Sequence, residues 1–172
     1  MNLTPCDESF AGQILSILND AILNSTALYD YKPRTPENMA TWFAAKRAGN
    51  FPIIGAVADD GELMGFASYG VFRNFPAYKY SVEHSVYVSK QHRGKGIGKL
   101  LLERIIDEAK RQEYHVLVGA IDAQNPVSIA LHQSLGFAHA GTIRQAGFKF
   151  GRWLDLEFYQ LILNTPTNPV GG

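Results

Sequence analysis

The sequence has a single cysteine among its 172 residues and therefore cannot form an internal disulfide bond. It has no apolar run near the roughly 20 residues needed to span a bilayer, because Lys, Asp, Gly or Asn interrupts every candidate. Its amino terminus also lacks the basic and then apolar profile of a secretory signal. These absences predict a soluble protein of the reducing cytoplasm, with no membrane partner.

The chain carries no net charge, since 16 Lys and Arg residues balance 16 Asp and Glu residues. Without an excess of positive charge it has no uniform field to attract nucleic acid, so we expect no nucleic-acid partner. With 46% hydrophobic and 19% charged residues, the composition is that of an ordinary globular protein. The length is that of one domain with its own core.

Hydrophobic periodicity, caps and turn residues predict an α/β domain. Apolar residues recur at three- and four-residue steps in the helical stretches, and turn signals such as Asp59-Asp60-Gly61-Glu62 bound the strand-like runs. The expected helices cover about 7–23, 36–48, 97–111 and 126–135, and the expected strands cover 53–58, 63–71, 81–88, 115–121, 138–147 and 152–162. Since no repeat or linker is visible, we expect a single domain over 1–163, in which helices flank a mixed central sheet. A flexible tail is expected over 164–172.

A glycine-rich turn, Gln91-His92-Arg93-Gly94-Lys95-Gly96-Ile97-Gly98, joins the strand over 81–88 to the helix over 97–111. The first backbone N–H groups of a helix lack partners within the helix, and the helix dipole adds positive potential there. Glycines let a phosphate approach those groups closely. The turn therefore predicts an anion site, with a plain structural turn as the alternative.

Two nucleotide-binding patterns fit this turn less well. A nucleoside-triphosphate loop requires a hydroxyl residue after Gly-Lys, and here Leu100 follows Lys99. A dinucleotide-binding loop requires a third glycine three places after the second, and Lys99 occupies that position. This second pattern is weakened but stays open, because Asp122 ends the next strand, where a ribose-binding acid is expected.

The turn and a second segment resemble the two cofactor motifs of the GCN5-related N-acetyltransferases. The pyrophosphate loop of that superfamily has Gln or Arg, two residues, Gly, one residue, and Gly or Ala, and Gln91–Gly96 is similar to it without a mismatch. Asn125–His132 and Leu135–Phe137 resemble the second motif, in which Asn and Ser bind the pantetheine and phosphate arm. The resemblance implies a mostly antiparallel sheet, acetyl-CoA as co-substrate and no metal. The implied cofactor-binding residues are Val86, Tyr87, Val88, Arg93, Gly94, Lys95, Gly96, Ile97, Gly98, Lys99, Asn125 and Ser128.

His132 occupies the position where the superfamily usually has a tyrosine that protonates the departing thiolate. The resemblance makes His132 a candidate general acid, because an imidazole can carry a proton near neutral pH. A solvated side chain on a short helix is an equally open interpretation. The backbone N–H near Val86 is a candidate donor to the carbonyl oxygen of the thioester.

Two longer segments resemble a narrower family, the phosphinothricin and methionine sulfoximine N-acetyltransferases. They are Tyr80–Val88 and Lys149–Leu156, and the similarity extends from about residue 11 to residue 163. That family acetylates the α-amino group of small glutamate-like amino acids by direct transfer from acetyl-CoA. The resemblance therefore predicts an amino-acid N-acetyltransferase. It also implies a homodimer, with the region Phe150–Trp153 near the partner's site.

Glu83 is the predicted general base of this reaction. An α-ammonium group must lose a proton before its nitrogen can attack the thioester, so a carboxylate or a water that it orients has to accept that proton. In the alternation of the strand over 81–88, Glu83 shares a face with Ser85, while its immediate neighbours face the other way. A surface ion pair with Lys79 or Arg73 is the alternative.

Cationic and donor groups beside the base are expected to bind the substrate carboxylate and its phosphinyl or sulfoximine group. The residues predicted to bind substrate are Arg73, Asn74, Phe75, Lys79, Glu83, His84 and Ser85, with Arg73 as the main anchor. Lys79 stands where arginine is common in that family, which is expected to alter substrate selectivity. Phe148 adds bulk near the expected substrate mouth, which favours more apolar amino acids. Two other functions stay open: the same fold acting on another amine, such as a protein N-terminus or polyamine, and a noncatalytic CoA-binding module.

Overall fold

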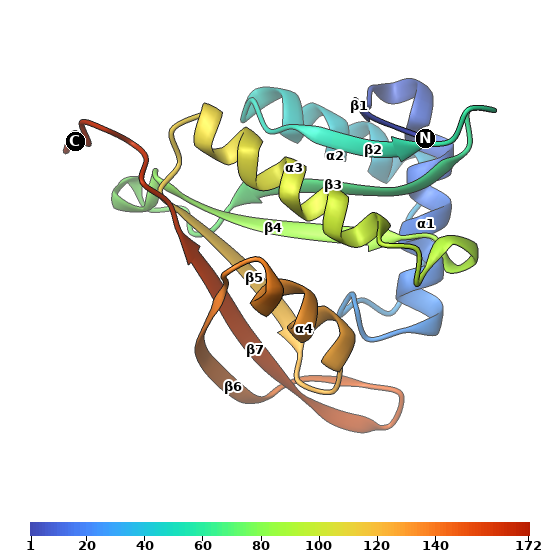
Figure 1. Cartoon of the computed structure of the whole chain (residues 1–172). Helices are drawn as coiled ribbons and strands as arrows, with labels where there is room; N and C mark the ends of the chain where they lie inside the picture. The colour runs from blue at the N-terminus through green and yellow to red at the C-terminus, as the bar shows by residue number, and fades with distance from the viewer. The chain divides into compact units, whose positions relative to one another are not determined.

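The computed structural model describes residues 1–172 and contains seven strands and four α-helices (Figure 1). The strands are β1 Asn2–Pro5, β2 Ile53–Val57, β3 Leu63–Val71, β4 Ser81–Val88, β5 Val116–Asp122, β6 Ala138–Lys149 and β7 Arg152–Ile162. The α-helices are α1 Ala11–Asn24, α2 Pro36–Ala48, α3 Ile97–Arg111 and α4 Pro126–Ser134. Three short 3₁₀ helices are η1 Glu8–Phe10, η2 Pro76–Tyr78 and η3 Lys90–His92.

The seven strands form one sheet in the order β1-β2-β3-β4-β5-β7-β6. Strands β4 and β5 run parallel, whereas β1–β2, β2–β3, β5–β7 and β6–β7 are antiparallel pairs. The expected α/β fold with a mixed, mostly antiparallel sheet is therefore confirmed. None of the helices is both long enough and apolar enough to cross a bilayer.

The amino-terminal segment differs from the expectation in two ways. The edge strand β1 was not predicted, because its four residues include a proline and are too few to show a periodic pattern. The first long helix was expected to start at about residue 7, but the Asp7 side chain accepts a hydrogen bond from the Ser9 N–H at 2.9 Å and caps η1. Helix α1 then begins at Ala11, directly after η1.

The residues pack into two compact units. One comprises residues 1–69 and 85–105, and the other comprises residues 70–84 and 106–172. Strand β4 and helix α3 each contribute residues to both units.

In the first unit, α1 and α2 pack on one face of β2 and β3. Their shared core consists of Ile14, Ile17, Leu18, Met39, Phe43, Ile53, Leu63 and Phe66. The ring of Trp42 meets Phe43 and Phe66 edge-on, with ring centroids 5.0 and 6.1 Å apart. Near the end of α2, Lys46 Nζ donates to the Tyr69 carbonyl oxygen at 2.8 Å and so connects α2 to β3. Burial lowers the pKa of Lys46 to about 8.

Gly65 lies on the face of β3 opposite to Phe66, where α3 packs. Figure 1 shows α3 in front of β3, with α1 and α2 behind it. A Cβ atom at Gly65 would lie 2.7 Å from the Tyr87 carbonyl oxygen, 3.1 Å from the Val88 Cα and 3.2 Å from a Leu101 methyl carbon. The first two atoms belong to the backbone of β4, which cannot rotate away as a side chain can.

Gly65→Ala is therefore expected to lower the free energy of unfolding by about 1–3 kcal/mol, as overpacking typically does. Urea denaturation measures this change. Gly12→Ala is the matched control, because a Cβ atom at this position in α1 meets nothing within 4 Å. The control is expected to raise stability by up to about 1 kcal/mol, since alanine is the better helix former. Equal stability of Gly65→Ala and the wild type would contradict the close approach of β4.

In the second unit, β5 pairs with β7, and β7 pairs with β6 in a long hairpin. The hairpin turns at Phe150 and Gly151, which have φ angles of 51° and 74°. The β6–β7 pairing contains two register shifts, between His139 and Gly141 and between Ile143 and Gly147. Such irregularities bend a strand and increase its twist.

The carboxy-terminal segment 164–172 contains no helix or strand. It hydrogen bonds to other residues of the second unit near both of its ends. His115 Nδ1 lies 2.7 Å from the Thr165 carbonyl oxygen, and the Val170 N–H donates to the Tyr80 hydroxyl at 2.9 Å. The flexibility of this segment stays a prediction.

Candidate active site

Glu83 is an exposed residue of β4 between two buried neighbours, Val82 and His84. The alternation expected from the sequence is confirmed at this part of the strand. Glu83 has no salt bridge to Arg73 or Lys79, so the surface ion pair considered as its alternative role is absent. Although the residue is exposed to solvent, the protein around its carboxyl partly desolvates it and so raises the pKa of Glu83. This carboxyl therefore binds a proton more readily than an ordinary glutamate does.

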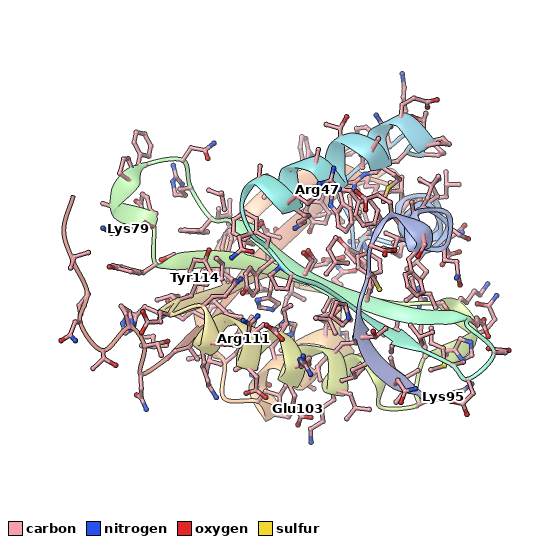
Figure 2. All side chains as sticks on the ribbon, turned by 90° about the horizontal axis from the view of Figure 1, so that it is seen from above. Arg47, Lys79, Lys95, Glu103, Arg111 and Tyr114 are labelled. Carbon is pink, nitrogen blue, oxygen red and sulfur yellow. The ribbon has the colours of Figure 1, made fainter.

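The loop between β3 and β4 carries most of the other predicted substrate-binding residues. Arg73–Phe75 are exposed. Lys79 follows η2, and Figure 2 shows it on this loop. Its Nζ atom lies 3.5 Å from the Gly171 carbonyl oxygen and 5.3 Å from the centroid of the Tyr80 ring. The Lys79 ammonium group is therefore in contact with the carboxy-terminal segment.

His84 and His132 form a buried pair, with 6% and 5% of their surfaces exposed. Their Nε2 atoms are 2.9 Å apart, and their ring planes are inclined by 24° with the centroids 5.1 Å apart. His132 Nδ1 lies 2.7 Å from the carbonyl oxygen of Ser128. Burial lowers the pKa of both rings. The interpretation of His132 as a solvated side chain is therefore wrong, whereas its role as a general acid stays a prediction.

The remaining predicted substrate contacts are His84 and Ser85. Both stay predictions, although the structure places them differently from Glu83. The ring of His84 faces the protein interior, and Ser85 is half-buried.

The glycine-rich turn between β4 and α3, the predicted anion site, contains two glycines with positive φ angles. Gly94 and Gly96 have φ angles of 76° and 78°, in the left-handed region that favours glycine. A Cβ atom at either glycine would meet nothing within 4 Å, so the surface of the turn is open. Helix α3 starts directly afterwards at Ile97. The turn therefore places a helix N-terminus beside an accessible backbone.

Two acidic groups from outside this turn contact Arg93 and His92. Arg93 Nη2 lies 3.6 Å from the carboxylate of Asp20 on α1. Lys95 Nζ lies 3.2 Å from His92 Nδ1, and His92 Nε2 lies 3.0 Å from the carboxylate of Glu62. Figure 2 shows Lys95 on this turn. Sequence reasoning missed both acids, because they belong to segments distant from the motif.

Asn125 and Ser128 lie at the N-terminus of α4. The Asn125 side-chain oxygen accepts a hydrogen bond from the Ser128 N–H at 3.1 Å and caps the helix. The amide nitrogen of Asn125 and the hydroxyl of Ser128 donate to no other group of the chain. Two donors at a helix N-terminus are thus available to a ligand, as the predicted cofactor contacts require.

A dinucleotide site finds little support in this structure. The side-chain oxygen of Asp122 accepts from the Gln124 N–H at 3.1 Å, and its carboxylate lies 3.8 Å from Arg152 Nη2. Asp122 is buried, and its carboxylate hydrogen bonds within the turn after β5. It therefore does not offer a surface acid for a ribose. No group of three or more His, Cys, Asp or Glu side chains is placed to hold a metal ion.

Known proteins match this chain along most of its length. The profile of the Acetyltransferase (GNAT) family matches residues 19–137. The L-methionine sulfoximine/L-methionine sulfone acetyltransferase of Salmonella typhimurium is 41% identical over 169 residues, which cover 98% of each chain. The L-amino acid N-acyltransferase MnaT of Escherichia coli is 43% identical over 156 residues, which cover 91% of this chain and 90% of that protein. The crystal structure of a GNAT superfamily phosphinothricin acetyltransferase from Sinorhizobium meliloti, in complex with acetyl-CoA, is 35% identical. It covers 94% of this chain and 88% of its own, with a TM-score of 0.91.

Proposed function

Since this chain belongs to the acetyltransferase (GNAT) family, we propose that it acetylates the α-amino group of a small L-amino acid or of an analogue such as methionine sulfoximine or phosphinothricin. The resemblance read from its motifs is confirmed by relatives with these activities in their names. The observation that carries the proposal is Glu83, an exposed carboxyl on β4 with a raised pKa and no cationic partner.

Glu83 accepts the proton of the substrate α-ammonium group, directly or through a water that it orients. A raised pKa makes its carboxylate a stronger base, which suits proton transfer nearer to neutral pH. Acetyl-CoA supplies the acetyl group as a thioester. The backbone N–H of Val86 is the proposed donor to the carbonyl oxygen of this thioester, where negative charge develops.

The glycine-rich turn and the start of α4 hold acetyl-CoA in this proposal. The residues Arg93–Lys99 bind the pyrophosphate, because positive φ angles at two glycines turn the backbone at the N-terminus of α3. The free donors of Asn125 and Ser128 suit the pantetheine and phosphate arm. The backbone of Val86–Val88 is proposed to contact the same arm.

Arg73 is the proposed anchor of the substrate carboxylate. It is exposed, and its planar guanidinium can bind a carboxylate through two parallel hydrogen bonds. Lys79, Asn74 and Phe75 extend this loop as further contacts, and Ser85 adds a hydroxyl on β4. Lys79 provides only a point charge, so the substrate range is proposed to differ from that of enzymes with arginine there.

We further propose that the protein is a cytoplasmic homodimer. The β6–β7 hairpin exposes three aromatic residues, Phe148 at 46%, Phe150 at 59% and Trp153 at 61%. Exposed apolar groups that gather in one place mark interaction surfaces. Acetylation of toxic amino-acid analogues by such an enzyme would confer resistance to them.

Thiol release from acetyl-CoA tests the proposed reaction with a panel of acceptors. The panel contains L-amino acids, methionine sulfoximine, phosphinothricin, spermidine and a short peptide with a free N-terminus. We expect release with an amino acid or analogue, and none with spermidine or the peptide. Release with spermidine or the peptide alone would assign a different acceptor. Binding of acetyl-CoA without release for any amine would point to a noncatalytic module.

A further inference from the structure

The hydrogen bonds of the His84–His132 pair have one possible direction when both rings are neutral. The Ser128 carbonyl oxygen can only accept, so His132 carries its proton on Nδ1 and has a lone pair on Nε2. The facing Nε2 of His84, 2.9 Å away, must then be the donor. As a result, Nδ1 of His84 is an acceptor, and it is the buried side-chain atom that has no hydrogen-bond partner.

The surroundings of the two rings keep them neutral and in contact. Burial lowers the pKa of both. The backbone of Gly119 on β5 passes beside them, and a Cβ atom there would lie 3.1 Å from Nε2 of His132 and equally close to Cε1 and Nε2 of His84. The Phe137 ring packs against both imidazoles, at centroid distances of 5.2 and 5.0 Å. A small residue and an aromatic ring thus enclose the pair and hold its geometry.

Taking the proposed acetyl transfer as its premise, we propose that His132 is a positioning residue and not the general acid. Through His84, it holds β4, which carries the base Glu83, against α4, which carries the cofactor-binding Ser128. The single N–H of His132 is bonded to the Ser128 carbonyl, so it has no proton directed at a leaving thiolate. The hydrogen-bonded chain from Ser128 to His84 thereby connects the cofactor helix to the residue beside the base.

His132→Gln and His132→Leu separate the two roles. The glutamine amide can accept from His84 and donate to the Ser128 carbonyl, but it cannot release a proton in the working pH range. Leucine leaves the His84 donor buried without a partner. We expect the kcat/KM of His132→Gln to be about tenfold or more above that of His132→Leu. The pH profile of kcat in His132→Gln should keep the shape of the wild-type profile. Equal losses in the two variants would overturn the proposal, because a general acid is missing from both.

A second measurement does not depend on activity or on the stability of a leucine variant. In ¹⁵N NMR spectra of the wild-type histidine rings, we expect the Nδ1–H tautomer at His132 and the Nε2–H tautomer at His84. Gly119→Ala is expected to shift the His84 Nε2 signal, because the added methyl group pushes the rings apart. Protonation of His132 on Nε2 would contradict the proposal. If the proposed reaction itself is wrong, no amine will release thiol, yet these tautomers will remain.

Discussion

Glu83→Gln is expected to lower kcat/KM for an amino-acid acceptor by about 10²–10⁴-fold, the usual contribution of a positioned general base. Glutamine keeps the shape and hydrogen-bonding atoms of the side chain but cannot accept the ammonium proton. The pKa of Glu83 is raised by burial and not by a neighbouring charge, so removing its charge breaks no ion pair. Steady-state thiol release measures the loss. Calorimetry is expected to show nearly unchanged binding of acetyl-CoA.

Glu103→Gln is the matched control for this variant. Glu103 projects from α3 in Figure 2, and the same change there is expected to leave kcat/KM within twofold of wild type. In the wild type, kcat/KM should rise as pH increases through the raised pKa of Glu83, since only the deprotonated form accepts a proton. This rise should be missing in Glu83→Gln. If Glu83→Gln retains both the rise with pH and the wild-type kcat/KM, Glu83 is not the general base.

The sign of the Glu83 shift also predicts its effect on folding. A carboxyl whose pKa is higher in the folded than in the unfolded state disfavours folding at any pH where it is ionised. Glu83→Gln removes this cost, so its melting temperature at neutral pH is expected to equal or exceed that of the wild type. Loss of activity together with higher stability is the pattern of a functional residue rather than a structural one.

Gly96→Ala is expected to raise the KM for acetyl-CoA by about 10- to 100-fold, with a smaller effect on kcat. The left-handed φ of 78° costs a residue with a Cβ atom about 1–2 kcal/mol, so the turn shifts. The added methyl group also occupies the open surface where a phosphate would approach the backbone. Initial rates at varied acetyl-CoA concentration give both constants.

Gly61→Ala controls for the backbone strain alone. Gly61 has a φ of 89°, and a Cβ atom there also meets nothing within 4 Å, but it lies in the turn between β2 and β3. Its stability should fall by an amount similar to that of Gly96→Ala, while its KM for acetyl-CoA stays near the wild-type value. A comparable rise of KM in both variants would show that strain, and not the phosphate-binding turn, causes the effect.

Long elements could be predicted closely because their signal repeats within one contiguous stretch. The predicted bounds of β4, α3 and β7 agree with those of the structure. The end of β6 was placed two residues early, at 147 instead of Lys149, because strand pairing rather than periodicity decides where a hairpin turns. The short edge strand β1 was missed for the related reason that only its pairing with β2 defines it.

The candidate site likewise has features that a local pattern predicts and contacts that only distant segments make. Glu83 and the glycine-rich turn could be chosen from the sequence as the candidate base and the candidate anion site, because each lies in a continuous motif: an alternating strand, and a run of glycines before a helix. The sequence could not show that Asp20 and Glu62 contact this turn. Their contacts with Arg93 and His92 join segments that are far apart in the sequence.

The sequence by itself determined the order of the longer elements, the family and the residues of its motifs, because local backbone preference and side-chain periodicity depend on neighbouring residues. Only the tertiary structure decided that His84 meets His132, 48 positions away, beside a glycine that makes room for both rings. It also decided that the His132 side chain is buried and hydrogen-bonded, although its place on a short helix was compatible with a solvent-exposed side chain. Which side chains meet depends on how distant elements pack, and no periodic pattern in a single sequence encodes that contact.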